Sequence, residues 1–392
     1  MTERYTWRDP IEIIGDRALA VMRPISISEV ASEKIKAGGV LDLYLHIPFC
    51  DRICDYCAFH VKALQPGEME KYIGVLKRHI TKTLSPFSEN QQVGSIFVGG
   101  GTPGLLKLDE TKAIFDAISG LVSVKNVPVS YELHPGNISD RYVDGLRGLG
   151  VTRFSVGIQN LSDKERKGIG RDITSSDDDI NGLCVLNRHN VQYNVDLMFG
   201  TPGQTPESWR GTLTKMTVEV RPPEITLYPF VDSPGALMYK PISRGVVTPP
   251  TKKERRNMYN LAGDYLTKVG YKQTSVLSFA LDAGNKRALL NSGTDFLGLG
   301  PRTYSGIGGY LFINQVRISD FLRGEKDANF KGIKIPSLVL NSVQEIFKLI
   351  AGKENQQSMN AINRTLGIMK AEGVAQTYKL LYYLMNNTSS SL

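Results

Sequence analysis

Short apolar runs alternate with helical patterns between residues 41 and 269. The apolar runs are bounded by glycine, proline and polar clusters, which is typical of strands. The predicted strands are 41–47, 95–98, 129–133, 152–156, 193–198 and 224–228. Between them, apolar residues recur every three or four positions, which predicts amphipathic helices. The predicted helices are 69–80, 109–121, 139–149, 176–187, 206–220 and 252–269.

Strands that alternate with helices in this way predict repeated βαβ units and a parallel sheet, so the fold class is α/β. Periodicity does not decide between a partly closed barrel and an open, doubly wound sheet. In both folds, ligands bind at the carboxyl ends of the strands. Polar residues that directly follow the predicted strands are therefore the candidates for a functional site.

The pattern changes outside this region, and we expect four segments. Residues 1–40 are weakly patterned and are expected to be an N-terminal extension that covers the mouth of the site. Residues 41–275 form the α/β core. Residues 276–330 are rich in glycine and aromatic residues, and residues 331–392 contain amphipathic patterns that predict a small helical C-terminal domain.

Composition indicates a folded protein with a large core. The chain has 392 residues, of which 41% are hydrophobic and 22% are charged. The N-terminus lacks a signal-peptide pattern and no apolar run approaches the roughly 18 residues of a membrane span, so we expect a cytoplasmic location. The net charge of +8 permits weak attraction to anionic substrates, membranes or nucleic acid. Basic residues are dispersed and no nucleic-acid motif is present, so we expect no nucleic-acid partner.

Three of the four cysteines lie in one loop after the first predicted strand. Cys50, Cys54 and Cys57 have the spacing C-x3-C-x2-C, and thiolates suit iron–sulfur clusters, zinc or copper(I). Three ligands hold three corners of a 4Fe–4S cluster and leave one iron open. Zinc sites usually have four ligands, and disulfides are typical of secreted proteins, so the spacing favours a cluster over these two alternatives. Cys184 lies in a predicted helix and is interpreted as a structural thiol.

The loop H-I-P-F-C-x3-C-x-Y-C-x-F resembles the cluster loop of radical S-adenosylmethionine (SAM) enzymes, in the branch of the oxygen-independent coproporphyrinogen III oxidases. The segments E-x-x-P at Glu132, R-x-S-x-G-x-Q ending at Gln159 and D-L-x-x-G-x-P-x-Q-T at Asp196 follow in the family's order. The resemblance implies a partial (β/α)6 barrel, a 4Fe–4S cluster on the three cysteines, and bound SAM. Arg171 resembles the family's N-R segment, although Gly170 stands where asparagine is usual.

The residues that match these segments, together with aromatic residues in and near the loop, are expected to surround the cofactor. Residues 99–101 are three glycines, which alone indicate a tight turn as readily as close approach to a ligand. In the family, this segment receives the methionyl amino group of SAM. The predicted cofactor-binding residues are Tyr44, Tyr56, Phe59, Gly100, Gly101, Thr102, Glu132, Gln159, Arg171 and Asp196. His46 is expected to make a structural hydrogen bond.

The family's chemistry is reductive cleavage of SAM to methionine and a deoxyadenosyl radical, and the resemblance allows several fates for that radical. Coproporphyrinogen oxidases carry a cysteine where this chain has Phe59, and haem chaperones usually begin shortly before the cluster loop, whereas 49 residues precede Cys50 here. Both departures favour a class C (HemN-like) radical methyltransferase that uses two SAM molecules. The alternatives are an oxygen-independent coproporphyrinogen III oxidase or anaerobic haem-modifying enzyme, and a non-catalytic haem chaperone.

The methyltransferase interpretation implies a flat apolar substrate that is methylated at an sp2 carbon. The naphthoquinone ring of menaquinone is the candidate, because a basic protein with an aromatic segment suits a lipid quinone at an anionic membrane surface. We therefore expect a small apolar or aromatic substrate, peripheral contact with the inner face of the membrane, and an electron donor such as flavodoxin or ferredoxin.

Overall fold

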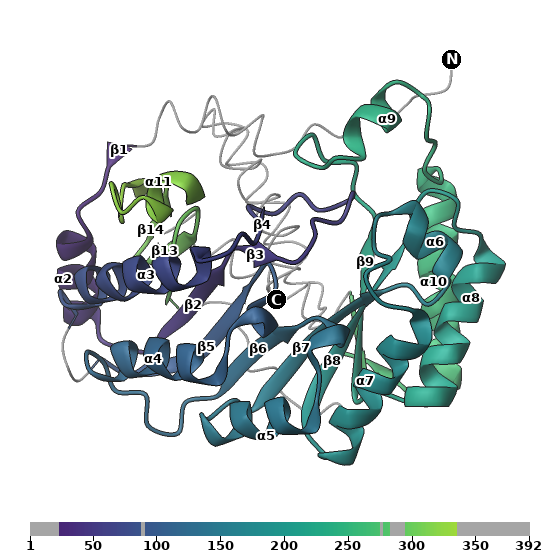
Figure 1. Cartoon of the computed structure of the whole chain (residues 1–392), viewed down its shortest axis with the longest axis horizontal. Coiled ribbons are helices and arrows are strands. Elements are labelled where there is room, and N and C mark those ends of the chain that lie inside the picture. The colour runs from purple at the N-terminus through teal and green to yellow at the C-terminus, as the bar shows by residue number, and fades with distance from the viewer. Residues whose placement is uncertain (1–22, 88–90, 275–276, 283–294, 335–392) are drawn as a thin grey trace, which may run out of the picture.

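The computed structural model describes residues 23–87, 91–274, 277–282 and 295–334 (Figure 1). The predicted helical C-terminal domain lies almost entirely outside these residues, as does most of the predicted N-terminal extension. No described helix has both the length and the apolar character that crossing a membrane requires.

All six predicted strands are present, and they pair in parallel in chain order. They are β2 (Leu41–Ile47), β5 (Val93–Gly100), β6 (Val129–Leu133), β7 (Arg153–Gln159), β8 (Gln192–Phe199) and β9 (Glu224–Pro229). The strand β12 (Asp295–Leu299) adds a further parallel pairing on the free side of β2. The carboxyl ends of these strands therefore meet along one edge of the sheet, where the prediction places the site.

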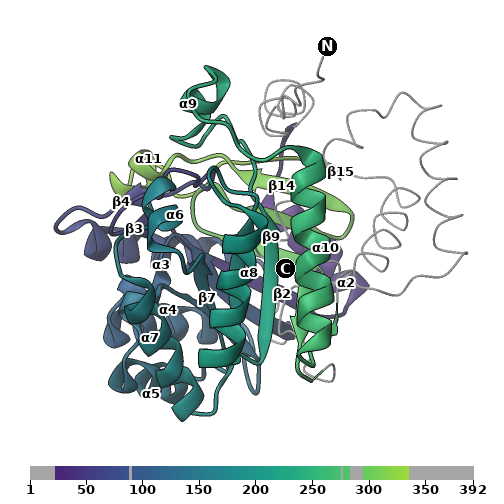
Figure 2. The ribbon, with the colours of Figure 1, turned by 90° about the vertical axis from the view of Figure 1, so that its right-hand side faces the viewer.

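Helices follow the parallel strands in the chain and cover the outer side of the curved sheet (Figure 1). They are α3 (Glu68–Leu84), α4 (Leu108–Ser119), α5 (Asp140–Gly148), α6 (Asp163–Gly168), α7 (Ser176–Arg188), α8 (Pro206–Lys215) and α10 (Lys252–Lys268). The predicted helix 206–220 is α8 followed by a π-helical turn, Met216–Val220. Ser139, Ser175, Thr205 and Thr251 cap α5, α7, α8 and α10 by accepting a backbone N–H in the first turn. Figure 2 shows α8 and α10 side by side outside β9.

Antiparallel strands extend the sheet at both edges, so the described part of the sheet does not close. Beyond β12 lie β13 (Tyr304–Ile307), β14 (Tyr310–Asn314), β15 (Phe330–Lys334) and β1 (Arg23–Pro24); beyond β9 lie β11 (Ser278–Ala280) and β10 (Lys272–Gln273). The predicted partial barrel is confirmed, and its sheet continues without a break into the glycine- and aromatic-rich segment. A separate pair, β3 (Phe49–Cys50) and β4 (Lys62–Ala63), flanks the cysteine loop.

The described part of the N-terminal segment lies against the far edge of the sheet. It contains β1, which pairs with β15, and α2 (Ile27–Ala37), where Lys34 forms a 3.0 Å ion pair with Asp295 at the start of β12. None of residues 23–40 lines the cavity described below. The prediction that the N-terminal extension covers the mouth of the site therefore applies only to residues 1–22. These residues lie outside the part of the chain that the structure describes.

Candidate functional site

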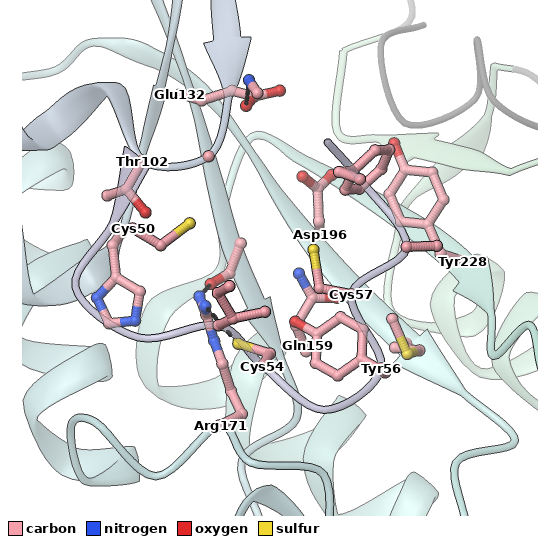
Figure 3. Close-up of a pocket in the computed structure, with 18 of the residues that line it drawn as sticks. Cys50, Cys54, Tyr56, Cys57, Thr102, Glu132, Gln159, Arg171, Asp196 and Tyr228 are labelled. Atoms are coloured by element: carbon pink, nitrogen blue, oxygen red, sulfur yellow. Dashed lines mark hydrogen bonds between the residues drawn. The ribbon is translucent and has the colours of Figure 1, made fainter. Parts of the chain in front are cut away.

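A cavity of about 270 Å³ opens at the carboxyl ends of the parallel strands (Figure 3). Twelve of the thirteen predicted site residues line it. They are Cys50, Cys54, Tyr56, Cys57, Phe59, Gly100, Gly101, Thr102, Glu132, Gln159, Arg171 and Asp196. These residues come from loops and strand ends that are far apart in the sequence, so the fold itself assembles the predicted site.

Tyr44 is the predicted residue that does not line the cavity. Its hydroxyl lies 3.1 Å from Nδ1 of His46, and its ring stacks on Phe97 with centroids 6.0 Å apart. The other ring nitrogen of His46 lies 3.0 Å from the carbonyl oxygen of His60, at the end of the cysteine loop. Burial lowers the pKa of His46 to about 4, so its ring is neutral. The predicted structural role of His46 agrees with these contacts, to which Tyr44 contributes.

The cysteine loop is anchored to two other parts of the chain through Asp55. The backbone N–H of Asp55 donates to the carbonyl oxygen of Ile169 at 3.1 Å, and the N–H of Met238 donates to the carbonyl of Asp55 at 2.8 Å. Gly170 has φ +66°, and a Cβ there would lie 3.0 Å from the nitrogen of Asp55. Glycine and asparagine are the residues that best tolerate positive φ. Gly170 therefore suits both the positive φ and the close approach of Asp55 at this position.

All three loop thiols are free and face the cavity. Burial raises the pKa of Cys57 to about 12 and also raises the pKa of Cys50, so both are protonated until a metal displaces the proton. Among the described residues, no three His, Cys, Asp or Glu side chains gather around one point as a single metal ion requires. Cys184 packs against the core from α7. Three spread thiols on one wall fit a cluster that takes one thiolate on each of three irons.

The glycine segment lies directly against the chain that leads into the cysteine loop. The N–H of Gly101 donates to the carbonyl of Ile47 at 2.8 Å, and the N–H of Thr102 donates to that of Phe49 at 2.6 Å. A Cβ on Gly101 would lie 2.4 Å from the Phe49 oxygen, and Gly100 has φ +120°. The glycines thus allow their own backbone to pack closely against the chain that enters the cysteine loop. They also leave backbone atoms accessible to a ligand at the cavity wall.

Two carboxylates reach the cavity from neighbouring parts of the sheet. Glu132 accepts the backbone N–H of Gly100 at 2.9 Å, and burial, with a smaller effect of Asp196, raises its pKa to about 8. Asp196 accepts from Ser155 at 3.2 Å and from Asn194 at 2.7 Å. Glu132 therefore changes its protonation state when the pH varies near neutrality.

Arg171 connects the loop between α6 and α7 to the cysteine loop. Its Nη1 donates to Sγ of Cys54 at 3.5 Å, and its Nη2 donates to the carbonyl of Gly157 in β7. Its own backbone is held by Arg166, a buried residue in a 3.0 Å ion pair with Asp179. The structure thus brings Arg171 beside a predicted cluster ligand 117 positions earlier in the chain.

Sequence reasoning missed several lining residues in the last positions of β8 and β9 or directly after β6 and β9. They are His134, Met198, Tyr228, Phe230, Val231 and Ser233. The strand-end rule identifies these positions, but their residue types alone carry no metal or cofactor signal. Phe59, Ile173 and Val231 are 48%, 38% and 39% exposed, so the mouth has an apolar rim.

Comparisons with known proteins show the family of the chain. The family model described as the radical SAM superfamily matches residues 44–216. The haem chaperone HemW of Buchnera aphidicola is 30% identical over 296 residues, which cover 73% of this chain and 76% of that protein. The chain belongs to the radical SAM superfamily, in its HemN/HemW-like branch. The anaerobic coproporphyrinogen III oxidase 1 of Cereibacter sphaeroides is 27% identical over 256 residues, which cover 64% of this chain and 56% of that protein.

The fold of this radical SAM protein is that of a solved relative. The coproporphyrinogen III oxidase HemN of Escherichia coli, described as a radical SAM enzyme, superposes with a TM-score of 0.75 at 22% identity, covering 92% of this chain and 86% of that chain. The cofactors of the family are a 4Fe–4S cluster and SAM, and the thiol set described above fits that cluster. The radical SAM relatives named here do not support the expectation of methyl transfer to menaquinone, because they are named for haem and coproporphyrinogen.

Proposed function

We propose that this chain is a radical SAM enzyme that acts on a tetrapyrrole. One observation carries the proposal: a single cavity combines the three cluster thiols, the matched SAM-binding residues and an apolar rim. When bound, the cluster and SAM supply one-electron chemistry that removes a hydrogen atom from a substrate carbon. An electron donor such as flavodoxin or ferredoxin completes the reaction, because the cluster must be reduced for each cleavage.

The chain's own residues bind and orient the reactants. Cys50, Cys54 and Cys57 hold the cluster on one wall, and Arg171 places a positive charge beside Cys54, where it offsets negative charge on the ligated thiolates. Glu132 offers an acceptor for the amino group of SAM. Burial of these groups excludes water from the site, which protects a radical from side reactions.

The mouth of the cavity suits a tetrapyrrole in its apolar character and charge. The macrocycle of a tetrapyrrole is apolar, which suits contact with Phe59, Ile173 and Val231. Its carboxylate side chains suit a chain with a net charge of +8. The printed names of the relatives, haem chaperone and coproporphyrinogen oxidase, support the same substrate class. Methylation of a quinone and the second SAM molecule that it requires are not part of this proposal.

A haem chaperone is the second candidate, and the similarity to HemW proteins favours it. Phe59, where the oxidases carry a cysteine, also separates this chain from them. In that case the cavity and its rim bind haem without transforming it, and the cluster has a role other than turnover.

Anaerobic turnover distinguishes these functions. The reconstituted protein is incubated with SAM, a reductant and coproporphyrinogen III, and the products are separated by mass. We expect 5′-deoxyadenosine together with a decarboxylated or otherwise altered tetrapyrrole. Haem binding without deoxyadenosine would instead identify a chaperone. S-adenosylhomocysteine and a methylated quinone, with no tetrapyrrole product, would contradict the proposal in favour of methyl transfer.

The raised pKa of Glu132 predicts pH-dependent binding of SAM. The cationic cofactor prefers ionised Glu132, whose pKa is about 8, so binding below that pH requires Glu132 to lose a proton. The affinity should therefore rise with pH between about 6.5 and 8, by up to about tenfold per unit. Calorimetric titration of the cluster-loaded protein measures this slope. Glu132→Gln should bind SAM more weakly and with a flatter profile; an unchanged slope would show that another group titrates.

A further inference from the structure

Arg302 lies in a turn at the carboxyl end of β12, in a backbone conformation that arginine rarely adopts. Its φ is +60°, in the left-handed region that favours glycine and asparagine. It follows Pro301, and proline followed by a residue with positive φ is the pattern of a type II turn, in which the second of these positions is usually glycine. Arginine here adds strain to the turn, and such strain is found mainly at functional sites.

The surroundings of the turn hold Arg302 in this conformation. The backbone N–H of Arg302 donates to the carbonyl of Asn314 at 2.9 Å, and the N–H of Asn314 donates to the carbonyl of Thr303 at 2.9 Å. Asn314 is fully buried in β14, and its side-chain amide donates to the carbonyl of Gly300 at 2.9 Å. Hydrogen bonds with one buried residue therefore fix the backbone of the turn, and with it the direction in which the Arg302 side chain leaves the chain.

The other non-glycine residues with positive φ, among those that the structure describes, have local explanations. Asn126 and Asn190 are asparagines, which tolerate this conformation, and Gln159 lines the cavity at the end of β7. Arg221, with φ +51°, directly follows the π-helical turn, and a left-handed residue is common where a helix ends. Arg302 ends no helix and resembles Gln159 in its place at the carboxyl end of a parallel strand.

The turn that carries Arg302 lies beside the mouth of the cavity. Because β12 pairs in parallel with β2, the turn lies next to His46 near the end of β2. A Cβ on Gly300 would lie 3.2 Å from Cβ of His46, and Nε2 of His46 lies 3.0 Å from the carbonyl oxygen of His60. His60 directly follows Phe59 of the apolar rim. Burial, followed by the charge of Arg302, lowers the pKa of His60 to about 4, so Arg302 is the cation of this pair.

The guanidinium of Arg302 is half-buried and has no acceptor or ion-pair partner among the described residues. Two cations in and after the cysteine loop have such partners. Arg52 forms a 2.8 Å ion pair with Asp172, and Lys62 forms one with Glu68. A guanidinium presents its N–H donors in a planar fork that matches the two oxygens of a carboxylate. Arg302 therefore has the charge and the donors to bind a carboxylate that the chain itself does not supply.

We propose that the guanidinium of Arg302 binds a carboxylate side chain of the substrate whose apolar part lies against Phe59. This inference rests on the proposed function, because a tetrapyrrole of the coproporphyrinogen class carries propionate groups around an apolar macrocycle. An apolar rim beside a cation binds both parts of such a molecule. Arg302 thus selects tetrapyrroles with free carboxylates over those with neutral side chains.

The test compares the dissociation constants of coproporphyrin III, the stable oxidised form of coproporphyrinogen III, and of its methyl ester, in which every carboxylate is neutralised. Binding to the cluster-loaded protein is followed by porphyrin fluorescence. Arg302→Gly should weaken coproporphyrin III by about 10- to 100-fold, the effect of losing a hydrogen bond to a charged group, and leave the ester within about twofold. Arg302→Lys keeps the charge but loses the planar fork, so its affinity should lie between those of Arg302→Gly and the wild type.

Thermal stability separates this binding role from a structural one. Glycine adopts positive φ without steric cost, so Arg302→Gly should melt no lower than the wild type although it binds coproporphyrin III less tightly. Arg221→Gly is the matched control, because it makes the same replacement at a positive φ and Arg221 does not line the cavity. It should also melt no lower than the wild type and leave both dissociation constants unchanged.

Each outcome bears on the inference or on the function beneath it. If Arg302→Gly weakens the acid and the ester equally, or weakens neither, the inference is overturned, whereas porphyrin binding by the wild type leaves the proposed function intact. A wild-type holoprotein that binds neither form contradicts the proposed function, and the inference with it. If Arg302→Gly does not fold, Arg302→Asn, which also tolerates positive φ, decides by the same ratio: a lost preference for the acid supports the inference and a retained one overturns it.

Discussion

Cys54→Ala abolishes both assembly of the 4Fe–4S cluster and cleavage of SAM. Cys54 is the most deeply buried of the three loop cysteines, and Arg171 is directed at its sulfur. With two thiolates left on the loop, the cluster keeps only two protein ligands, and the open iron that binds SAM loses its defined position. Iron and sulfide content, absorbance near 400 nm and deoxyadenosine yield should all fall to the level of the protein-free control.

Cys184→Ala is the matched control for this result. Cys184 packs against the core from α7 and lines no part of the cavity. Its replacement should cost about 1 kcal/mol of the free energy of unfolding and leave cluster content and SAM cleavage intact. A Cys54→Ala protein that still holds the cluster and cleaves SAM would refute the assignment of the loop as the cluster site.

Gly101→Ala lowers SAM cleavage by about 100-fold although it removes no functional group. The new Cβ would lie 2.4 Å from the backbone oxygen of Phe49 and 2.9 Å from its nitrogen, and backbone atoms have no alternative rotamer. The glycine segment and the chain entering the cysteine loop must therefore move apart. A displacement on the scale of an ångström at a catalytic site costs about 100-fold in rate, and the overpacking costs about 1–3 kcal/mol of stability. Rate and melting temperature are both measured on the reconstituted protein.

Gly148→Ala separates this steric effect from the general effect of a glycine substitution. Gly148 lies at the end of α5, and a Cβ there would meet nothing within 4 Å. Alanine in a helix is more favourable than glycine by up to about 1 kcal/mol, so this variant should be as active and as stable as the wild type. Equal activity of Gly101→Ala and Gly148→Ala would contradict the tight approach at the cavity wall.

The strands of the core were predictable because apolar runs between polar loops are a local signal. The predicted strands 41–47 and 129–133 coincide with β2 and β6, whereas 95–98 is the centre of the longer β5, whose ends contain glycine. The strand β12 was not predicted. It contains Gly298, where a Cβ would lie 2.3 Å from the backbone oxygen of Tyr304. The close approach of the next strand requires glycine at this position, and the glycine interrupts the apolar run by which a strand is predicted.

The site was predictable only to the extent that motifs identify it. The spacing of the cysteines indicated a metal site, but Arg171 approaches Cys54 across 117 positions, a contact that periodicity does not reveal. The family motif predicted only that Arg171 contacts the cofactor. His134 was overlooked because it occupies a variable position of E-x-x-P, and only the structure places it at the cavity wall. The choice among functions rested on Phe59 and on the length ahead of Cys50, and the relatives, which are named for haem and coproporphyrinogen, do not support the methyltransferase that these two features favoured.

Transfer of deuterium tests the central claim most directly. Coproporphyrinogen III deuterated on its propionate side chains is incubated anaerobically with the cluster-loaded protein, SAM and a reductant, and the released 5′-deoxyadenosine is analysed by mass spectrometry. If the chain directs hydrogen abstraction at a tetrapyrrole, deuterium appears in deoxyadenosine with wild-type protein and in none of the product with Cys54→Ala. Deoxyadenosine that forms without deuterium, or haem that binds with no deoxyadenosine at all, would contradict the account.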